Sequence, residues 1–221
     1  MAVAALRLYG VAALTDRNGK ALAPQTTLVV QRELGAVVRV APFNAVEMSD
    51  RELDDYRQVI DSVFEETTVL PAPFGTVFRS ADHVQRWLKA HHLALNEGIH
   101  LVQGRCEMRV HVSHRRESAP AAGAPPVSEV RDTRDDERRW GELNAQAADI
   151  FRQLRRNVSA AVPLRPAQPV SSSGSAFLVE RTQWRDFVEA VSVMAKRADE
   201  LRVETSGPWP PFAFVRMDLG A

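Results

Sequence analysis

The stretch Gly104-Arg105-Cys106-Glu107-Met108-Arg109-Val110-His111-Val112 carries the clearest structural signal in the chain. Polar and apolar side chains alternate along it, and the apolar set is Cys106, Met108, Val110 and Val112. A period of two residues indicates a β-strand with one face on a core and the other toward solvent or a partner. We therefore expect Cys106 to be buried, with Glu107 on the polar face.

The elements that follow this strand define a fold. A helix is predicted from near Thr133, and a second helix over 182–200 carries an apolar stripe. Short strands are predicted at 160–164, 176–179, 201–203 and 212–215. The order is β-α-β-β-α-β with an extra strand at the end, which is a modified ferredoxin-like pattern. We assign it to a C-terminal domain over 98–221, with a mobile loop near 113–132, where periodicity is lost.

The N-terminal part mixes strands and helices. Extended segments are predicted at 6–14, 27–30, 36–40 and 69–78. Ser49 and Glu52 form a capping box that begins one helix, and Ser80 caps a second helix that we expect to end at Gly98. Residues 1–97 therefore read as an α+β domain, so the whole chain is α+β with two domains.

Composition excludes several classes of protein. The 221 residues carry 28 basic and 28 acidic side chains, which is not the charge of a nucleic-acid-binding protein. A single cysteine rules out an intrachain disulfide and fits a reducing cytoplasm. No apolar run approaches the roughly 18 residues that a membrane span needs. We expect a cytoplasmic protein that binds neither nucleic acid nor membrane.

Candidate chemical groups do not assemble into a catalytic or metal site. His91 and His92 are adjacent, so on one helix they diverge by about 100° and do not share an ion easily. Cys106 falls on the apolar face of its strand, as an inert thiol would. Glycine-rich phosphate loops are absent from the sequence. We therefore predict no catalytic residues, no metal and no cofactor.

The C-terminal segment is rigid and aromatic. It reads Gly207, Pro208, Trp209, Pro210, Pro211, Phe212, Ala213, Phe214 and Val215. Proline fixes φ and pushes the preceding residue toward extended geometry, so little freedom is left to lose on contact with a partner. Two interpretations stay open: the aromatic residues cover the core of the domain, or they dock onto another protein.

The same segment resembles the GPWPPY-x-FV signature of the gas vesicle protein F and L family (GvpF/GvpL), with Phe212 where that pattern has Tyr. Residues 69–78 resemble the LP-x-x-FGTVF segment of that family, although Pro73 stands where a basic residue is commoner. Residues 104–110 and 175–179 resemble two further segments. The positions in the second motif that match are Pro71, Phe74, Gly75, Thr76, Val77 and Phe78.

The resemblance implies a non-enzymatic minor structural or assembly protein associated with gas vesicles. Such a protein would help nucleate or organise the hydrophobic shell protein, and its partners would be that shell protein and other gas vesicle accessory proteins. The F and L branches both fit these motifs. The alternative is a ferredoxin-like small-molecule-binding regulatory module or an enzyme, because one fold hosts many unrelated functions.

Overall fold

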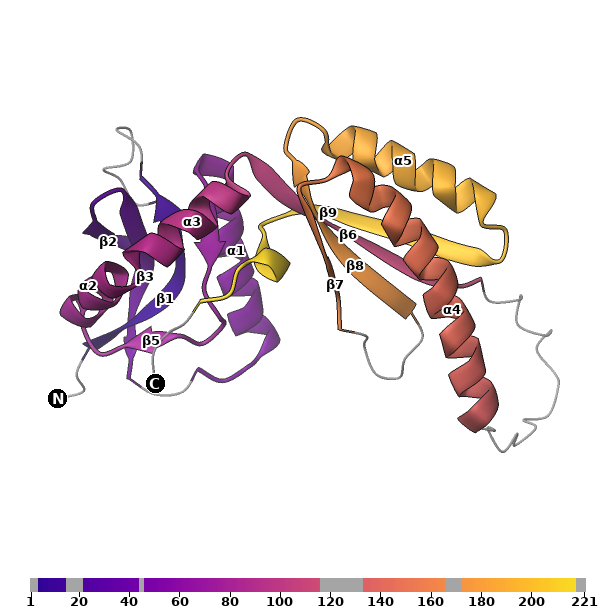
Figure 1. Cartoon of the computed structure of the whole chain (residues 1–221). Helices are drawn as coiled ribbons and strands as arrows, with labels where there is room; N and C mark the ends of the chain where they lie inside the picture. Colours follow the sequence, from indigo (N-terminus) through magenta and orange to yellow (C-terminus); the bar gives the residue numbers. More distant parts are fainter. Residues whose placement is uncertain (1–3, 15–21, 44–45, 116–132, 166–171, 218–221) are drawn as a thin grey trace. The chain divides into compact units, whose positions relative to one another are not determined.

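The structure is a computed structural model, and it describes residues 4–14, 22–43, 46–115, 133–165 and 172–217 (Figure 1). Most of the predicted mobile loop, 116–132, lies outside these residues. The chain forms two compact units, which we call the first unit (Met1–Cys106 with Trp209–Ala221) and the second unit (Glu107–Pro208). The boundary predicted at residue 97 falls inside a helix, and the predicted C-terminal domain does not keep its last residues, because these pack in the first unit.

The first unit is built on a five-stranded sheet. Its strands are β1 (Ala4–Ala13), β2 (Thr27–Gln31), β3 (Leu34–Pro42), β4 (Val69–Pro71) and β5 (Val77–Phe78). The order is β2-β3-β1-β4, and β5 also pairs with β1. Central strand β1 is antiparallel to β3, with the register shifting between Leu8 and Gly10. Gly10 is required at this place, because a Cβ there would lie 2.7 Å from the Leu70 carbonyl oxygen.

Among the described residues of the first unit, three α-helices accompany the sheet: α1 (Asp50–Glu66), α2 (Ala81–Ala90) and α3 (His92–Val102). The predicted N-caps are confirmed, since Ser49 accepts from the Glu52 amide and Ser80 from the His83 amide. The capping box at Ser49 is only half formed, because the Ser49 amide donates to the Glu47 carbonyl and the Glu52 carboxylate pairs with Arg7. The single helix expected up to Gly98 is two helices, because the backbone of His91 leaves helical geometry. Gly98 is not a stop but lies inside α3, where its small size admits Leu70.

The second unit is the β-α-β-β-α-β arrangement that the sequence predicted. Its elements are β6 (Arg105–His114), α4 (Thr133–Leu154), η1 (Arg155–Asn157), β7 (Ala160–Pro163), β8 (Ser172–Glu180), α5 (Trp184–Arg197) and β9 (Leu201–Trp209). The first two residues of β6 and the last residue of β9 belong to the first unit. The sheet order is β7-β8-β6-β9. Phe177 of β8 contacts Phe151 of α4 and Phe187 of α5, so both helices pack on one face of the sheet (Figure 1).

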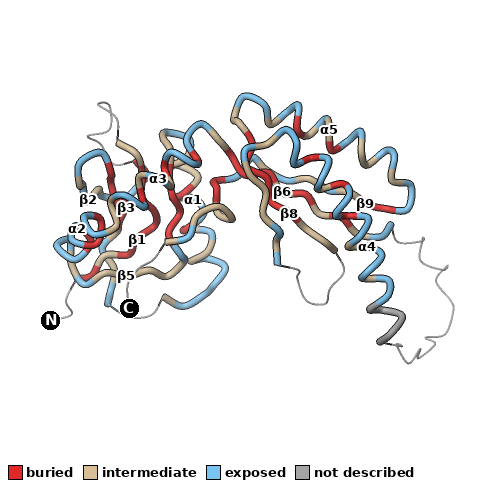
Figure 2. The backbone as a smooth tube through the Cα atoms, in the orientation of Figure 1, coloured by how far each residue is buried: buried red, intermediate tan, exposed pale blue. Residues whose placement is uncertain are grey.

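Burial follows the central strands of both sheets, β1 and β3 in the first unit and β6 and β8 in the second (Figure 2). Cys106 is buried, as predicted, and its sulfur is not part of a disulfide. The expectation for Glu107 was wrong: its side chain is fully buried, and Arg109 donates from Nε to its Oε1 at 2.6 Å. Alternation shows which residues share a face of a strand, but it does not show whether that face is covered.

The chain end also differs from the prediction. Strand β9 continues to Trp209, and the strand expected at 212–215 is instead the 3-10 turn η2 (Phe212–Phe214). The Phe212 amide donates to the Pro210 carbonyl at 2.8 Å, and the Phe214 amide to the Pro211 carbonyl at 3.2 Å. Because these amides bond within the segment, they do not extend the sheet as an additional strand.

Candidate interaction surfaces

Gly207 is fixed by the geometry of the second unit. Its φ of 127° lies in a region that side chains with a Cβ rarely adopt. A Cβ at this position would lie 2.8 Å from both the Glu107 carbonyl oxygen and the Met108 sulfur. No L-residue with a side chain fits this approach of β9 to β6, so Gly207 has a structural role in this motif.

The three prolines after Gly207 hold the next part of the chain. The Gly207–Pro208 peptide bond is cis, while Pro210 and Pro211 are buried. Trp209 between them is 41% exposed. Pro210 and Pro211 therefore pack inward and Phe212 and Phe214 are half-buried, whereas Pro208 and Trp209 are exposed, so docking onto another protein stays a prediction.

The two sequence motifs meet at one side chain of the first unit, Tyr56. Phe74 contacts the Tyr56 ring edge-on, with centroids 5.7 Å apart, and Phe212 contacts it at 6.2 Å. Tyr9 stacks on the same ring at 6.1 Å, and the Tyr56 hydroxyl donates to the Ala72 carbonyl at 2.5 Å. We call Tyr9, Tyr56, Phe74 and Phe212 the aromatic cluster. It joins segments that lie more than a hundred residues apart in the sequence.

The other residues of the second motif shape the turn that presents Phe74. Pro71 is buried and lies opposite Gly10 in the pairing of β4 with β1. Gly75 has a φ of 80°, and this positive φ explains the glycine, since a Cβ there would meet only Val46 at 3.7 Å. The Thr76 hydroxyl donates to the Pro73 carbonyl at 2.7 Å.

The last two residues of each of the two motifs also lie in the first unit. Val77 and Phe78 form β5, and Phe78 contacts Trp87 with centroids 5.6 Å apart. Phe214 and Val215 are half-buried and line a pocket of about 190 Å³ with Trp87 and other residues of α2 and α3. No motif residue supplies a nucleophile or a ligand group to a shared site, so the motifs have a packing role here.

An ionic network that the sequence analysis missed borders the aromatic cluster. Arg7 is buried, pairs with Glu52, and lies over the rings of Tyr9 and Phe74 at 5.0 and 5.1 Å. Asp55 accepts from Arg39 Nη1 at 2.7 Å and from the Tyr9 hydroxyl at 2.8 Å. The signal in the sequence was Arg7 itself, a charged residue inside an apolar strand, because buried charges need partners.

Burial and charge set the proton affinities of this network. Burial raises the pKa of Tyr9 to about 12, and its hydrogen bond to Asp55 acts in the same direction, although the charges of Arg7 and Arg39 oppose it. Burial alone would also raise the pKa of Asp55, but the bonds and charges of Arg39, Tyr9 and Arg7 lower it below its ordinary value. Asp55 is therefore held as a carboxylate.

This network lies in an open cleft of about 700 Å³. The lining includes Arg7, Tyr9, Arg39, Glu52 and Asp55, which bond to one another. The carboxylates of Glu52 and Asp55 each have an arginine partner, so the charges are balanced within the protein. The arrangement is that of a structural network beside the core, although its size also fits a small ligand.

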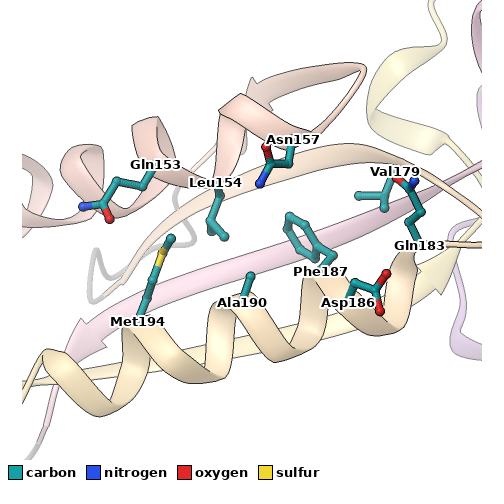
Figure 3. Close-up of a pocket in the computed structure, with 9 residues that line it drawn as sticks. All are labelled: Gln153, Leu154, Asn157, Val179, Gln183, Asp186, Phe187, Ala190 and Met194. Atoms are coloured by element: carbon teal, nitrogen blue, oxygen red, sulfur yellow. The ribbon is translucent and has the colours of Figure 1, made fainter.

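A second hollow of about 450 Å³ lies in the second unit between α4 and α5 (Figure 3). Leu154 and Phe187 point into it, and Met194 lies farther along α5. The polar groups at its margin are Gln153, Asn157, Gln183 and Asp186. One carboxylate among three uncharged amides does not form a catalytic constellation, so this hollow is a surface groove.

The part of the chain that the structure describes contains neither a cluster of metal-ligating side chains nor a membrane-spanning helix. No group of three or more His, Cys, Asp or Glu side chains there is placed to hold a metal ion. Within the same residues, no helix combines the length and the apolar character that crossing a bilayer requires.

Comparison with known proteins points in one direction. Residues 6–216 match the family described as gas vesicle synthesis protein GvpL/GvpF. The chain is 27% identical over 210 residues to gas vesicle protein F1 of Halobacterium salinarum, covering 93% of this chain and 88% of that protein. It is 28% identical over 179 residues to gas vesicle protein L of a Streptomyces species, covering 71% and 66%.

Solved structures show the same fold. The crystal structure of the gas vesicle protein GvpF from an Anabaena species superposes with a TM-score of 0.75 at 17% identity and covers 97% of each chain. The GvpF structure from Microcystis aeruginosa gives a TM-score of 0.71 at 18% identity, covering 97% of this chain and 100% of the other. Relatives of both the F and the L kind match the sequence.

Proposed function

Because this chain belongs to the gas vesicle synthesis protein GvpL/GvpF family, we propose that it is a non-enzymatic minor component that helps nucleate or organise the hydrophobic shell protein during vesicle formation. The chain is a gas vesicle protein by family, and the specific role is our proposal. Its partners would be the shell protein and other accessory proteins of the vesicle, with which it would be associated in the cell.

The observation that carries this proposal is the position of Trp209. The indole is 41% exposed, and the residues on both sides of it are prolines, two of which are buried against the fold. An aromatic side chain held in this way loses little entropy when it is covered. Tryptophan is also among the residues that most often dominate the binding energy of an interface. We propose that Trp209 is the anchor that contacts the shell protein.

The test is a pull-down of the shell protein from co-expressing cells, using the full chain and its Trp209→Ala variant. Loss of an interface anchor costs at least about 2 kcal/mol, so the variant should bind about thirtyfold more weakly. Leu93→Ala is the matched control, because Leu93 of α3 is a large apolar residue of the first unit that is 73% exposed.

Two outcomes would contradict the proposal in different ways. Failure of the wild-type chain to retain the shell protein would remove the proposed partner. Undiminished binding by a Trp209→Ala variant whose circular dichroism and melting temperature match wild type would leave the partner but remove the anchor. Equal loss in Leu93→Ala would point to general apolar adhesion instead of a defined contact.

The competing function is a small-molecule-binding module or an enzyme. The ionic cleft of the first unit favours it in one respect, since its polar groups converge in a volume suited to a ligand. A ligand would have to displace the internal ion pairs of Glu52 and Asp55. A thermal-shift screen with nucleotides and metabolites separates the two functions, because a saturable stabilisation abolished by Arg39→Ala would support the ligand-binding one.

A further inference from the structure

Strand β9 forms an edge of the sheet in the second unit. The sheet order β7-β8-β6-β9 places it last, and among the described residues no strand pairs with its outer side. It spans nine residues, whereas β7 at the opposite edge spans four and ends at Pro163. A long edge presents backbone donors and acceptors to which another strand can bond.

Two charged residues on β9 form an exposed pair. Arg202 and Glu204 are two residues apart, so their side chains share one face of the sheet. Arg202 Nη2 lies 2.7 Å from Glu204 Oε1, and the two side chains are 66% and 56% exposed. Val203 between them is half-buried on the other face. An exposed pair of this kind contributes little to the fold of one chain.

The order of these charges is self-complementary. If β9 pairs antiparallel with β9 of a second copy around a two-fold axis at Val203, each Arg202 faces Glu204 of the other copy. Two opposite-charge pairs then form across the interface. We propose that this protein forms a symmetric dimer through β9, with the two sheets joined edge to edge around Val203.

The same charges disfavour the neighbouring registers. An axis at Arg202 would place the two arginines opposite each other, and it would also bring Glu204 opposite Glu200 of the other copy. An axis at Glu204 would place the two glutamates opposite each other. Moving the axis by one residue shifts the pairing of the two β9 strands by two residues. Because like charges directly opposite each other are destabilising, this shift costs free energy in either direction. Pro208 has no amide donor and lies beyond the paired stretch 201–205.

Charge reversal tests the proposal directly. Sedimentation of the full wild-type chain over a wide range of concentrations should show a monomer–dimer equilibrium. Arg202→Glu and Glu204→Arg should each weaken the dimer by about tenfold or more, because each replaces two attractive pairs with two repulsive ones. Circular dichroism establishes that both variants fold.

Mixing the two variants is the decisive measurement. An Arg202→Glu chain has two acidic residues at these positions and a Glu204→Arg chain has two basic ones, so the equimolar mixture should form a heterodimer that native mass spectrometry resolves. The ion pair within each chain is not restored by mixing, which excludes a purely structural effect. Arg152→Glu is the control, because Arg152 and Asp149 form a comparable exposed pair on α4.

Several results would overturn the β9 dimer. A wild-type chain that stays monomeric at every concentration would do so, as would single variants that dimerise like wild type. Failure of the mixture to form heterodimers while both variants remain folded would show that Arg202 and Glu204 do not face each other. If only a strand from a different protein protects the β9 amides from hydrogen exchange, the edge serves a heterologous partner instead.

Discussion

The two ends of the C-terminal motif belong to different parts of the molecule. Gly207 and Pro208 lie in the second unit, where β9 passes too close to β6 for any side chain. Trp209 to Val215 lie in the first unit, where Phe212 packs on Tyr56. One short motif therefore meets two unrelated requirements: Gly207 leaves space for the backbone of β6, and Phe212 makes an apolar contact. Substitutions at the two ends of the motif should therefore destabilise different units.

The largest effect is expected for Gly207→Val, which should destabilise the second unit by about 3 kcal/mol or more. The new Cβ would clash with the Glu107 carbonyl and the residue would keep an unfavourable positive φ. Hydrogen exchange measured by mass spectrometry should show the loss in β6 and β9. Gly141→Ala is the control: nothing lies within 4 Å of its Cβ, so alanine in α4 should be neutral or slightly stabilising. If the amides of β6 and β9 in Gly207→Val exchange as slowly as in wild type, β9 can move away from β6 without loss of stability, which would contradict this prediction.

Phe212→Ala should act on the first unit and cost about 2–3 kcal/mol, less than the roughly 3–5 kcal/mol of a core phenylalanine because the residue is only half-buried. The expected result is faster hydrogen exchange in α1 and β4, with the second unit unchanged. Phe43→Ala removes a ring that is 52% exposed and should cost much less. If Phe212→Ala loosened the second unit instead, the contrast between the two ends of the motif would fail.

The smallest effect is expected for Asp55→Asn, about 1–2 kcal/mol at neutral pH, since the change weakens charged hydrogen bonds to Arg39 and Tyr9. Because folding lowers the pKa of Asp55, its stabilisation is complete above the unfolded pKa near 3.9 and is lost as pH falls through the lower folded pKa. Melting curves of wild type and variant should therefore converge below about pH 4. Asp54→Asn is the control and should change the melting temperature at neutral pH little, because its pair with Arg57 is exposed. Curves that stay parallel into acid would contradict a role for the ionised carboxyl.

The parts of the fold predicted correctly were those decided by local patterns. The caps at Ser49 and Ser80 and the alternating run of β6 depend on nearest neighbours along the chain, and the structure confirms them. The break at His91 and the burial of Glu107 depend on the residues that pack against them. The periodicity of a single sequence does not reveal which residues those are.

The candidate surfaces show the same limit. Motif resemblance located Phe74 and Phe212, but nothing in the sequence indicated that both contact Tyr56. Arg7 could have been suspected of having a buried partner, since it interrupts an apolar strand. Its partner Glu52 was assigned to a capping box, whereas its carboxylate pairs with Arg7 and the Ser49 amide donates to the Glu47 carbonyl.

The route of the chain between the units has a consequence for synthesis. It enters the second unit after Cys106 and returns to the first after Pro208, so the second unit interrupts the first in sequence. During synthesis, Tyr9, Tyr56 and Phe74 are made before any residue of the second unit, whereas Phe212 follows its last strand. The unit that begins first is therefore finished last, and until then its aromatic cluster lacks one of its four rings.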